Sequence, residues 1–151
     1  MDNSSPILTA EQAAAFEADG YIIVRQFFSA EQIGILHEMA LADPAMGESS
    51  QRLDAEGIAS KVTLANDISD NIYSAFAANE RMVTAAEQLM SDEVYHFHHK
   101  MMLKEPRIGG AWEWHQDFGY WYDQQHVMFP DMVSVAIAVD RANRDNGCLQ
   151  V

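Results

Sequence analysis

Two residues with the side chains of a metal site stand two positions apart in the densest aromatic stretch of the chain. His115 and Asp117 lie within residues 112–121, which read WEWHQDFGYW. On an extended chain, residues i and i+2 point to the same side about 6.6 Å apart, so an imidazole and a carboxylate can converge on one ion. Such a pair supplies two positions of the 2-His-1-carboxylate triad of non-haem Fe(II) oxygenases. The alternative is a structural or surface ion pair between the two side chains.

The spacing does not select a third metal ligand. Glu113 shares the parity of His115 and Asp117, but three ligands on one strand would span about 13 Å, which is too far for one metal ion. We therefore interpret Glu113 as a carboxylate that supports the ligands from outside or faces solvent. Either His96 or His98 could supply the missing nitrogen, and nothing in the spacing chooses between them.

A basic face is predicted on a strand that precedes position 105. One face of this strand carries His96, His98, Lys100, Met102 and Lys104, and the other carries Tyr95, Phe97, His99, Met101 and Leu103. The basic face could receive an anionic ligand, because a buried carboxylate needs a cation and hydrogen-bond donors. The alternative is a wet edge whose histidines are satisfied by water.

The first half of the chain has the pattern of helices, and these helices must support the residues described above. The predicted helices cover about residues 10–18, 30–42, 68–76 and 80–90. The segments 9–12 (TAEQ) and 29–32 (SAEQ) both match the capping box, in which a hydroxyl and a Gln side chain satisfy each other's backbone donors. Gly20 ends the first helix, and Asn79 is a candidate cap for the last one.

Strands are predicted where β-branched and aromatic residues gather. They cover residues 21–28, 94–103, 111–115 and 132–139, with a new strand beginning at 148–151. Residues 46–60 have no clear period and predict a loop, and residues 145–147 (DNG) predict a turn. Helices first and strands later indicate an α+β fold. A strand that has barely begun lacks its partners, so we expect that the sequence is truncated.

Composition excludes several classes of function. The 151 residues fit one domain, and the net charge of −14 repels a phosphate backbone, so nucleic acid is not an expected partner. The single cysteine, Cys148, excludes an internal disulfide framework and a multi-cysteine metal site. No targeting peptide and no apolar run of about 20 residues is visible. We expect a soluble, cytoplasmic protein with a small-molecule substrate and no membrane partner, and the oligomeric state stays open.

Three segments resemble the phytanoyl-CoA dioxygenase family, whose members include ectoine hydroxylases. They are residues 19–33 (DGYIIVRQFFSAEQI), 114–117 (WHQD) and 146–151 (NGCLQV). The likeness runs in the correct order over nearly the whole chain, and three spaced motifs are more specific than one His-x-Asp pair. The resemblance implies the N-terminal portion of such a protein. Residues 1–151 would form a single, incomplete oxygenase domain, mainly helical over about 1–92 and with the first barrel strands over about 93–151.

The resemblance also implies a fold and a metal chemistry. The family fold is a double-stranded β-helix, a jelly-roll barrel with N-terminal helices packed against it. Its enzymes use Fe(II), 2-oxoglutarate and O2. By this resemblance His115 and Asp117 would be the first histidine and the carboxylate of the catalytic metal triad.

Four further residues match family positions that bind small molecules. Lys104, in MLKEP, matches the lysine of an NLKP segment that contacts 2-oxoglutarate in ectoine hydroxylases, and Lys100 is a second candidate. His98 falls where those hydroxylases place a substrate-contacting glutamine, and Trp121 matches a pocket tryptophan. Because His98 departs from glutamine, the resemblance argues against ectoine itself and leaves a small polar or zwitterionic metabolite as the expected substrate.

Two residues of the family pattern have no match in this sequence. They are the distal histidine and the arginine that binds the far carboxylate of 2-oxoglutarate. The inferred full-length parent is a hydroxylating dioxygenase, and we expect the isolated 151 residues to be poorly active or inactive. Two alternatives stay open. One is a non-catalytic binding module or pseudoenzyme of the same fold, and the other is a cupin-like metal enzyme without a cosubstrate, in which His96 or His98 is the third ligand.

Overall fold

The chain folds into two compact units. The structure, a computed structural model, describes residues 6–48, 50–105, 107 and 109–151. The first unit comprises the residues up to Leu41 together with Leu64–Lys100, and the second comprises Ala42–Thr63 and Met101–Val151. A single domain over residues 1–151, divided near residue 92, stays a prediction.

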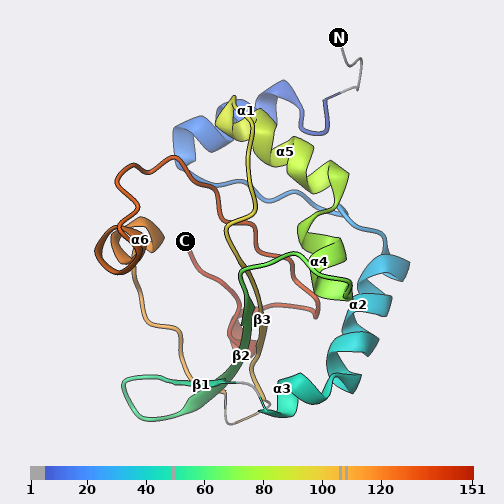
Figure 1. The fold of residues 1–151 in the computed structure, drawn as a ribbon, viewed down its shortest axis with the longest axis vertical. Helices are drawn as coiled ribbons and strands as arrows, with labels where there is room; N and C mark the ends of the chain where they lie inside the picture. Colours follow the sequence, from blue (N-terminus) through green and yellow to red (C-terminus); the bar gives the residue numbers. More distant parts are fainter. Residues whose placement is uncertain (1–5, 49, 106, 108) are drawn as a thin grey trace. The chain divides into compact units, whose positions relative to one another are not determined.

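Helices form most of the first unit. They are α1 (Ala10–Asp19), α2 (Ala30–Ala42), α4 (Ile72–Ala77) and α5 (Glu80–Met90), labelled in Figure 1. The Thr9 and Ser29 hydroxyls each accept a hydrogen bond from the backbone N–H three residues later, at 3.2 and 3.1 Å. Asn79 caps α5 as predicted. Three predicted helices are therefore confirmed, while the fourth begins at Ile72, later than expected, because Asn71 caps it.

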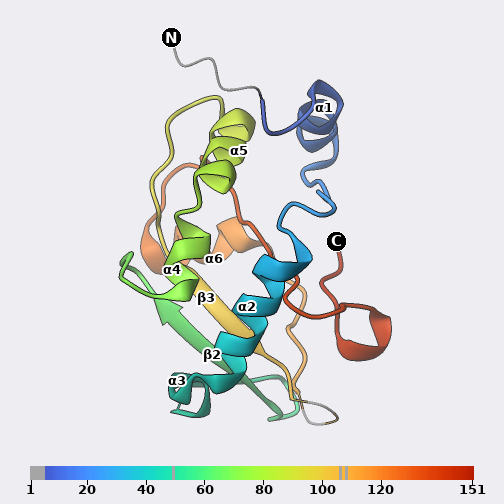
Figure 2. The same cartoon turned by 90° about the vertical axis from the view of Figure 1, so that its right-hand side faces the viewer.

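Helix α5 organises the packing of the first unit. Its Gln88 side-chain carbonyl accepts hydrogen bonds from the backbone N–H groups of Ile7 and Leu8, at 2.9 and 3.0 Å, which fixes the chain before α1. Both views of the fold show α5 beside α1 and α4 (Figures 1 and 2). The rings of Phe28 and Phe76 pack with centroids 4.8 Å apart, and Phe28 is buried. Leu8, Phe28 and Ala85 are buried apolar residues of this unit.

The strand predicted over residues 21–28 is wrong. This segment forms turns and irregular backbone, with Gln26 at a positive φ of 56°. The Arg81 guanidinium donates a hydrogen bond to the Phe27 carbonyl at 2.6 Å and lies 4.8 Å from the Phe27 ring centroid. A side chain therefore takes a backbone acceptor that a strand partner would use. Phe28 is buried, while Tyr21 and Ile23 are exposed, so the β-prone composition of this segment does not lead to a ladder.

The second unit carries a small sheet and short helices. Its elements are α3 (Pro44–Glu48), β1 (Ser50–Leu53), β2 (Ala59–Ala65), β3 (His99–Leu103), α6 (Asp117–Gln125) and a 3-10 turn (Arg144–Asn146), with β2 and β3 extending to residues of the first unit. The three strands form one sheet in the order β1-β2-β3. The α+β class predicted from the sequence is confirmed.

The loop predicted over residues 46–60 is also wrong, because most of this segment forms an antiparallel β-hairpin. In the register of β1 and β2, Ser50 lies opposite Val62 and Leu53 opposite Ala59. The turn depends on Asp54, whose Oδ1 accepts from the backbone N–H groups of Glu56 and Ile58 at 3.0 and 2.7 Å. A local side-chain turn sets the register here, and residue periodicity does not reveal it.

The remaining predicted strands are shorter or not formed. The strand expected over 94–103 begins only at His99, and residues 111–115, 132–139 and 148–151 join no ladder among the residues the structure describes. A β-prone composition fits a sheet surface, but a ladder also needs a neighbouring strand. The turn over 145–147 is formed and ends at Gly147 with φ 78°.

No helix in the described part of the chain is long and apolar enough to cross a membrane.

Candidate metal centre

His115 and Asp117 lie where an irregular segment enters α6. Asp117 is the first residue of the helix, and His115 stands two residues before it. Gln116, between them, has extended backbone with φ −106° and ψ 123°. The expected strand over 111–115 is not formed, so the same-side placement of the two side chains comes from one extended residue at the start of a helix.

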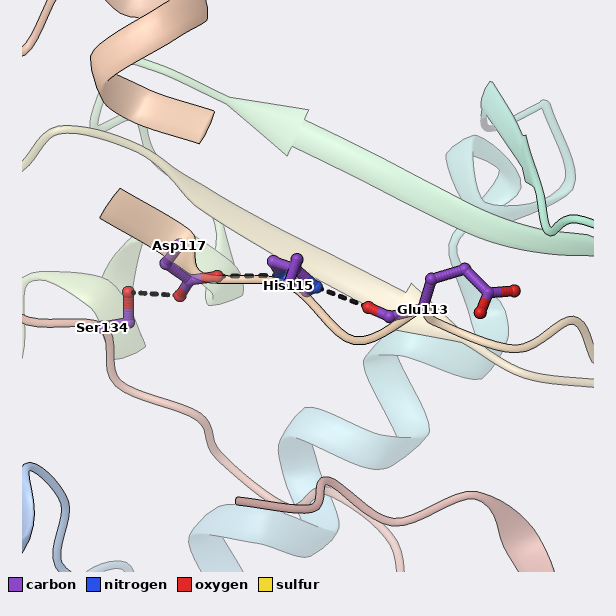
Figure 3. A network of polar contacts seen from close by, with 4 residues as sticks. All are labelled: Glu113, His115, Asp117 and Ser134. Atoms are coloured by element: carbon purple, nitrogen blue, oxygen red, sulfur yellow. Dashed lines mark hydrogen bonds and ion pairs between the residues drawn. The ribbon is translucent and has the colours of Figure 1, made fainter. Parts of the chain in front are cut away.

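The two candidate ligands meet directly, as Figure 3 shows. His115 Nε2 lies 2.9 Å from Asp117 Oδ1. His115 Nδ1 lies 2.6 Å from the backbone carbonyl oxygen of Glu113, and the Ser134 hydroxyl donates to Asp117 Oδ2 at 3.1 Å. Each candidate ligand is therefore oriented by a hydrogen bond on the atom that does not face the other ligand: the Glu113 carbonyl bonds His115, and the Ser134 hydroxyl bonds Asp117.

The contact with the Glu113 carbonyl shows which nitrogen of the His115 ring carries hydrogen. A carbonyl oxygen only accepts hydrogen bonds, so Nδ1 must carry hydrogen and donate it. In the neutral ring, Nε2 then presents a lone pair to a carboxylate oxygen 2.9 Å away. Two acceptors repel each other at this distance unless a second proton or a cation lies between them. The pair is therefore either an imidazolium–carboxylate ion pair or a chelating pair for a metal ion.

The separation of His115 Nε2 and Asp117 Oδ1 suits a direct charged hydrogen bond and also the edge of a metal site. Two ligands in adjacent positions of an octahedral site, each at about 2.1 Å from the metal, lie about 3 Å apart. The separation of 2.9 Å between Nε2 and Oδ1 matches this edge. The side chains of His115 and Asp117 are 42% and 55% exposed, so the pair can be reached from solvent. Within the described ranges, no group of three His, Cys, Asp or Glu side chains could hold a metal ion.

Asp117 is supported by its helix as well as by Ser134. The first turn of α6 carries unpaired backbone N–H groups and the positive end of the helix dipole, which favour a carboxylate there. Ser134 comes from residues 132–139, seventeen positions later, and spacing alone could not have linked it to Asp117. Glu113 was expected either to support the ligands through its carboxylate or to face solvent, whereas it contacts His115 through its backbone carbonyl.

A comparison with protein families decides the relationship. The family model described as phytanoyl-CoA dioxygenase matches residues 16–151. The chain belongs to the phytanoyl-CoA dioxygenase family. This confirms the resemblance found in the sequence motifs.

Individual relatives of this phytanoyl-CoA dioxygenase family member give the extent of the match. The ectoine dioxygenase of Sphingopyxis alaskensis is 31% identical over 160 residues, covering 99% of this chain and 50% of the relative. That of Stutzerimonas stutzeri is 25% identical over 150 residues, covering 95% and 49%. The L-proline trans-4-hydroxylase of Streptomyces griseoviridis is 35% identical over 82 residues, covering 54% and 31%. The chain spans about half the length of the ectoine dioxygenases, or less for the hydroxylase, and no solved structure matches it.

The candidate 2-oxoglutarate lysine of this family member packs beside a motif glycine. Lys104 is half-buried directly after β3. A Cβ on Gly147 would lie 3.1 Å from Lys104 Nζ, and a Cβ on Gly109 would lie 2.8 Å from Lys104 Cβ. The lysine therefore runs along backbone at both glycines, one of which belongs to the NGCLQV segment. Lys100 is exposed on β3 in the first unit, and its part in cosubstrate binding stays a prediction.

The two candidate substrate residues belong to different units. His98 precedes β3 in the first unit, with its ring centroid 5.4 Å from that of Phe97. Trp121 lies on α6 in the second unit, half-buried, with Tyr120 packed edge-on at 4.9 Å. Their shared role in substrate binding stays a prediction.

His96 pairs with a histidine that the sequence placed on the opposite face. His96 Nε2 lies 3.0 Å from His99 Nδ1. The parity expectation is wrong here, because the chain becomes a strand only at His99 and the two-residue period does not hold before it. Burial lowers the pKa of His99, and the neighbouring His96 lowers it further. The roles of His96 and His98 as a third metal ligand stay predictions.

Stability should fall on acidification because of His99. The pKa of His99 in the folded chain is below the unfolded value of about 6.5, so the unfolded state binds its proton first. Its contribution to the unfolding free energy is complete above pH 6.5 and is lost as pH falls through the lowered pKa. Urea unfolding from pH 7.5 to 5 should show this loss, and His99→Asn should flatten it. His126→Asn, at an exposed histidine, is the control, and equal slopes in both variants would contradict the assignment.

Proposed function

We propose that this chain supplies the N-terminal portion of a dioxygenase that depends on Fe(II) and 2-oxoglutarate and hydroxylates a small organic metabolite. The observation that carries the proposal is the 2.9 Å approach of His115 Nε2 to Asp117 Oδ1, with Nδ1 already occupied by a carbonyl. Membership of the phytanoyl-CoA dioxygenase family supports the same chemistry.

In this proposal His115 and Asp117 hold the iron through Nε2 and Oδ1. The Glu113 carbonyl keeps the proton on Nδ1 and so keeps Nε2 available as a ligand. The Ser134 hydroxyl holds Oδ2 and so turns Oδ1 toward the histidine. When bound, iron with 2-oxoglutarate and O2 supplies the oxidising power for hydroxylation, while the protein supplies position and charge.

The lysines would serve the cosubstrate. An ammonium can attract a carboxylate of 2-oxoglutarate, and Lys104, held against Gly109 and Gly147, loses less side-chain freedom on binding than an unrestrained lysine would. Lys100 is the second candidate for this role. His98 and Trp121 are proposed to contact the substrate.

The substrate proposed is a small zwitterion. The relatives named above are two ectoine dioxygenases and an L-proline hydroxylase, and both ectoine and L-proline are small molecules of that type. The net charge of −14 mildly disfavours a strongly anionic thioester, because most of the surface would repel it.

The fold proposed for the whole protein is the jelly-roll barrel, with the sheet β1-β2-β3 as one part of it. Catalytic metal sites usually have three protein ligands, and the proposed site has two from this chain. We therefore propose that the 151-residue chain alone turns over 2-oxoglutarate poorly.

Metal titration of the 151-residue chain tests the assignment. Co(II), which does not oxidise in air as Fe(II) does, should bind in one-to-one stoichiometry in calorimetry and raise the melting temperature by mass action. His115→Ala should weaken binding at least about 100-fold, since it removes a ligand. Glu113→Gln is the matched control and should bind within about twofold of the parent, because the backbone carbonyl is unchanged and the amide oxygen can still accept from the Ala55 N–H. A parent that binds no metal, or a His115→Ala variant that binds as well, would count for the binding-module alternative.

A further inference from the structure

The β1–β2 hairpin holds the segment that leads to the metal centre. The backbone N–H of Gly110 donates to the Ala59 carbonyl at 3.1 Å, and the buried Ser60 hydroxyl donates to the Gly110 carbonyl at 3.1 Å. One residue later, the Ala111 N–H donates to Asp54 Oδ2 at 2.8 Å. All of these residues belong to the second unit, so the segment after β3 is fixed to the hairpin within one compact body.

The approach of the two segments is too close for any side chain at Gly110. A Cβ there would lie 2.3 Å from the Ile58 carbonyl oxygen and 3.2 Å from Asp54 Oδ2. Real Cβ atoms do not come so near to a backbone oxygen. The hairpin turn and the passing segment therefore have one tight arrangement, and Asp54 stands at the point of contact.

Asp54 is bonded on both of its carboxylate oxygens. Oδ1 closes the turn by accepting from Glu56 and Ile58, and Oδ2 reaches across to Ala111. The hydrogen bond from Ala111 is the largest of the influences that lower the pKa of Asp54, and the bond from Ile58 comes next. The charged carboxylate is thus the form that the contact requires.

The contact between Asp54 and Ala111 is connected to the His115 imidazole through Ala55 and Glu113. Glu113 follows Ala111 by two positions, and its Oε1 lies 3.5 Å from the backbone N–H of Ala55 in the same turn. The Glu113 carbonyl then accepts from His115 Nδ1 at 2.6 Å. The turn therefore contacts the chain at two points just before the carbonyl that fixes the imidazole.

We propose that Asp54 is a positioning residue for the metal centre, which holds residues 110–113 so that the Glu113 carbonyl fixes the orientation and the tautomer of His115. The inference rests on the proposed function, since it assigns Asp54 a role toward the metal ligand. Asp54 touches neither the metal position nor a substrate and acts only through backbone.

Asp54→Asn separates the two duties of this carboxylate. The amide oxygen can still close the turn, but an NH2 group in place of Oδ2 faces the Ala111 N–H, and two donors cannot bond. Gly57→Ala is the matched control. Gly57 lies in the same turn at φ 81°, where any side chain strains the backbone, and it makes no contact with residues 110–113 through a new Cβ, since nothing lies within 4 Å of that position.

The test compares these two variants with the parent chain in two measurements. In Co(II) calorimetry, Asp54→Asn should weaken binding about tenfold, as expected when the support of a ligand is lost, while Gly57→Ala stays within about twofold. In 15N NMR of the metal-free chain, recorded at a pH high enough for the imidazole to be neutral, His115 should lose its uniform Nδ1–H tautomer in Asp54→Asn and keep it in Gly57→Ala.

Each outcome bears on one of the two proposals. A tautomer and an affinity that change equally in both variants would overturn the role of Asp54 and leave the metal assignment standing. If the parent binds no Co(II), the proposed function fails, and the NMR measurement still decides whether Asp54 controls His115. A tautomer unchanged in Asp54→Asn overturns the inference in either case.

Discussion

Asp117→Ala is expected to weaken metal binding at least about 100-fold and to abolish hydroxylation in the full-length protein. The variant removes Oδ1, which lies 2.9 Å from His115 Nε2. The described residues contain no cluster of three possible metal ligands, so no second carboxylate stands ready to replace Asp117. The folded chain should survive, because the side chain is 55% exposed and leaves no cavity. Its urea unfolding free energy should stay within about 1 kcal/mol of the parent, the scale of a charge at a helix N-terminus.

Asp117→Asn is the matched variant for this prediction. The amide keeps the shape of the side chain and an oxygen for the Ser134 hydroxyl, but it loses the charge. It should start α6 nearly as well and still bind metal much more weakly than the parent. An Asp117→Ala chain with an unchanged Co(II) dissociation constant would remove Asp117 from the ligand set.

Gly110→Ala is expected to destabilise the chain by about 2–4 kcal/mol, the combined scale of overpacking and of a lost buried hydrogen bond. The new Cβ would meet the Ile58 carbonyl oxygen at 2.3 Å, so the backbone must move. That movement breaks the bond to Ala59 and leaves the buried Ser60 hydroxyl without the Gly110 carbonyl. Urea unfolding followed by circular dichroism measures the loss.

Gly119→Ala tests whether the steric argument is specific. Gly119 lies within α6, and nothing lies within 4 Å of a Cβ built there. Alanine is the better helix former by about 0.5–1 kcal/mol, so this variant should be slightly more stable than the parent. Equal stability of the Gly110→Ala and Gly119→Ala chains would refute the close approach at the hairpin.

Sequence predicts the elements of this fold where the determining interactions are local. The capping boxes at Thr9 and Ser29 lie within one helical turn, and Asn79 begins α5 as expected. Strand predictions succeeded less often because a strand depends on a distant partner. Residues 132–139 have a sheet-prone composition without a ladder among the described residues, and β1 was missed because its partner is set by a turn at Asp54.

The candidate site shows the same division. The two-residue spacing of His115 and Asp117 predicted that their side chains approach one another, although the strand assumed for it is not formed and one extended residue before α6 places them. It could not reveal Ser134, which comes from a later part of the chain, or Glu113, whose contribution is a backbone carbonyl that every residue has. Support for a ligand through backbone leaves no signal in residue types.

The start of α6 has a consequence for the rate at which the site can assemble. Gln116 makes no side-chain capping bond, so the first turn of the helix, with Asp117 as its first residue, lacks the stabilisation that Ser, Thr, Asp or Asn would give. Helix ends without caps fray and re-form within about a microsecond. The distance between the two ligand atoms should therefore fluctuate on this timescale in the free chain. If the pair binds a metal ion as proposed, the ion would encounter an ensemble of open and closed pairs, and binding should reduce the fraying of α6.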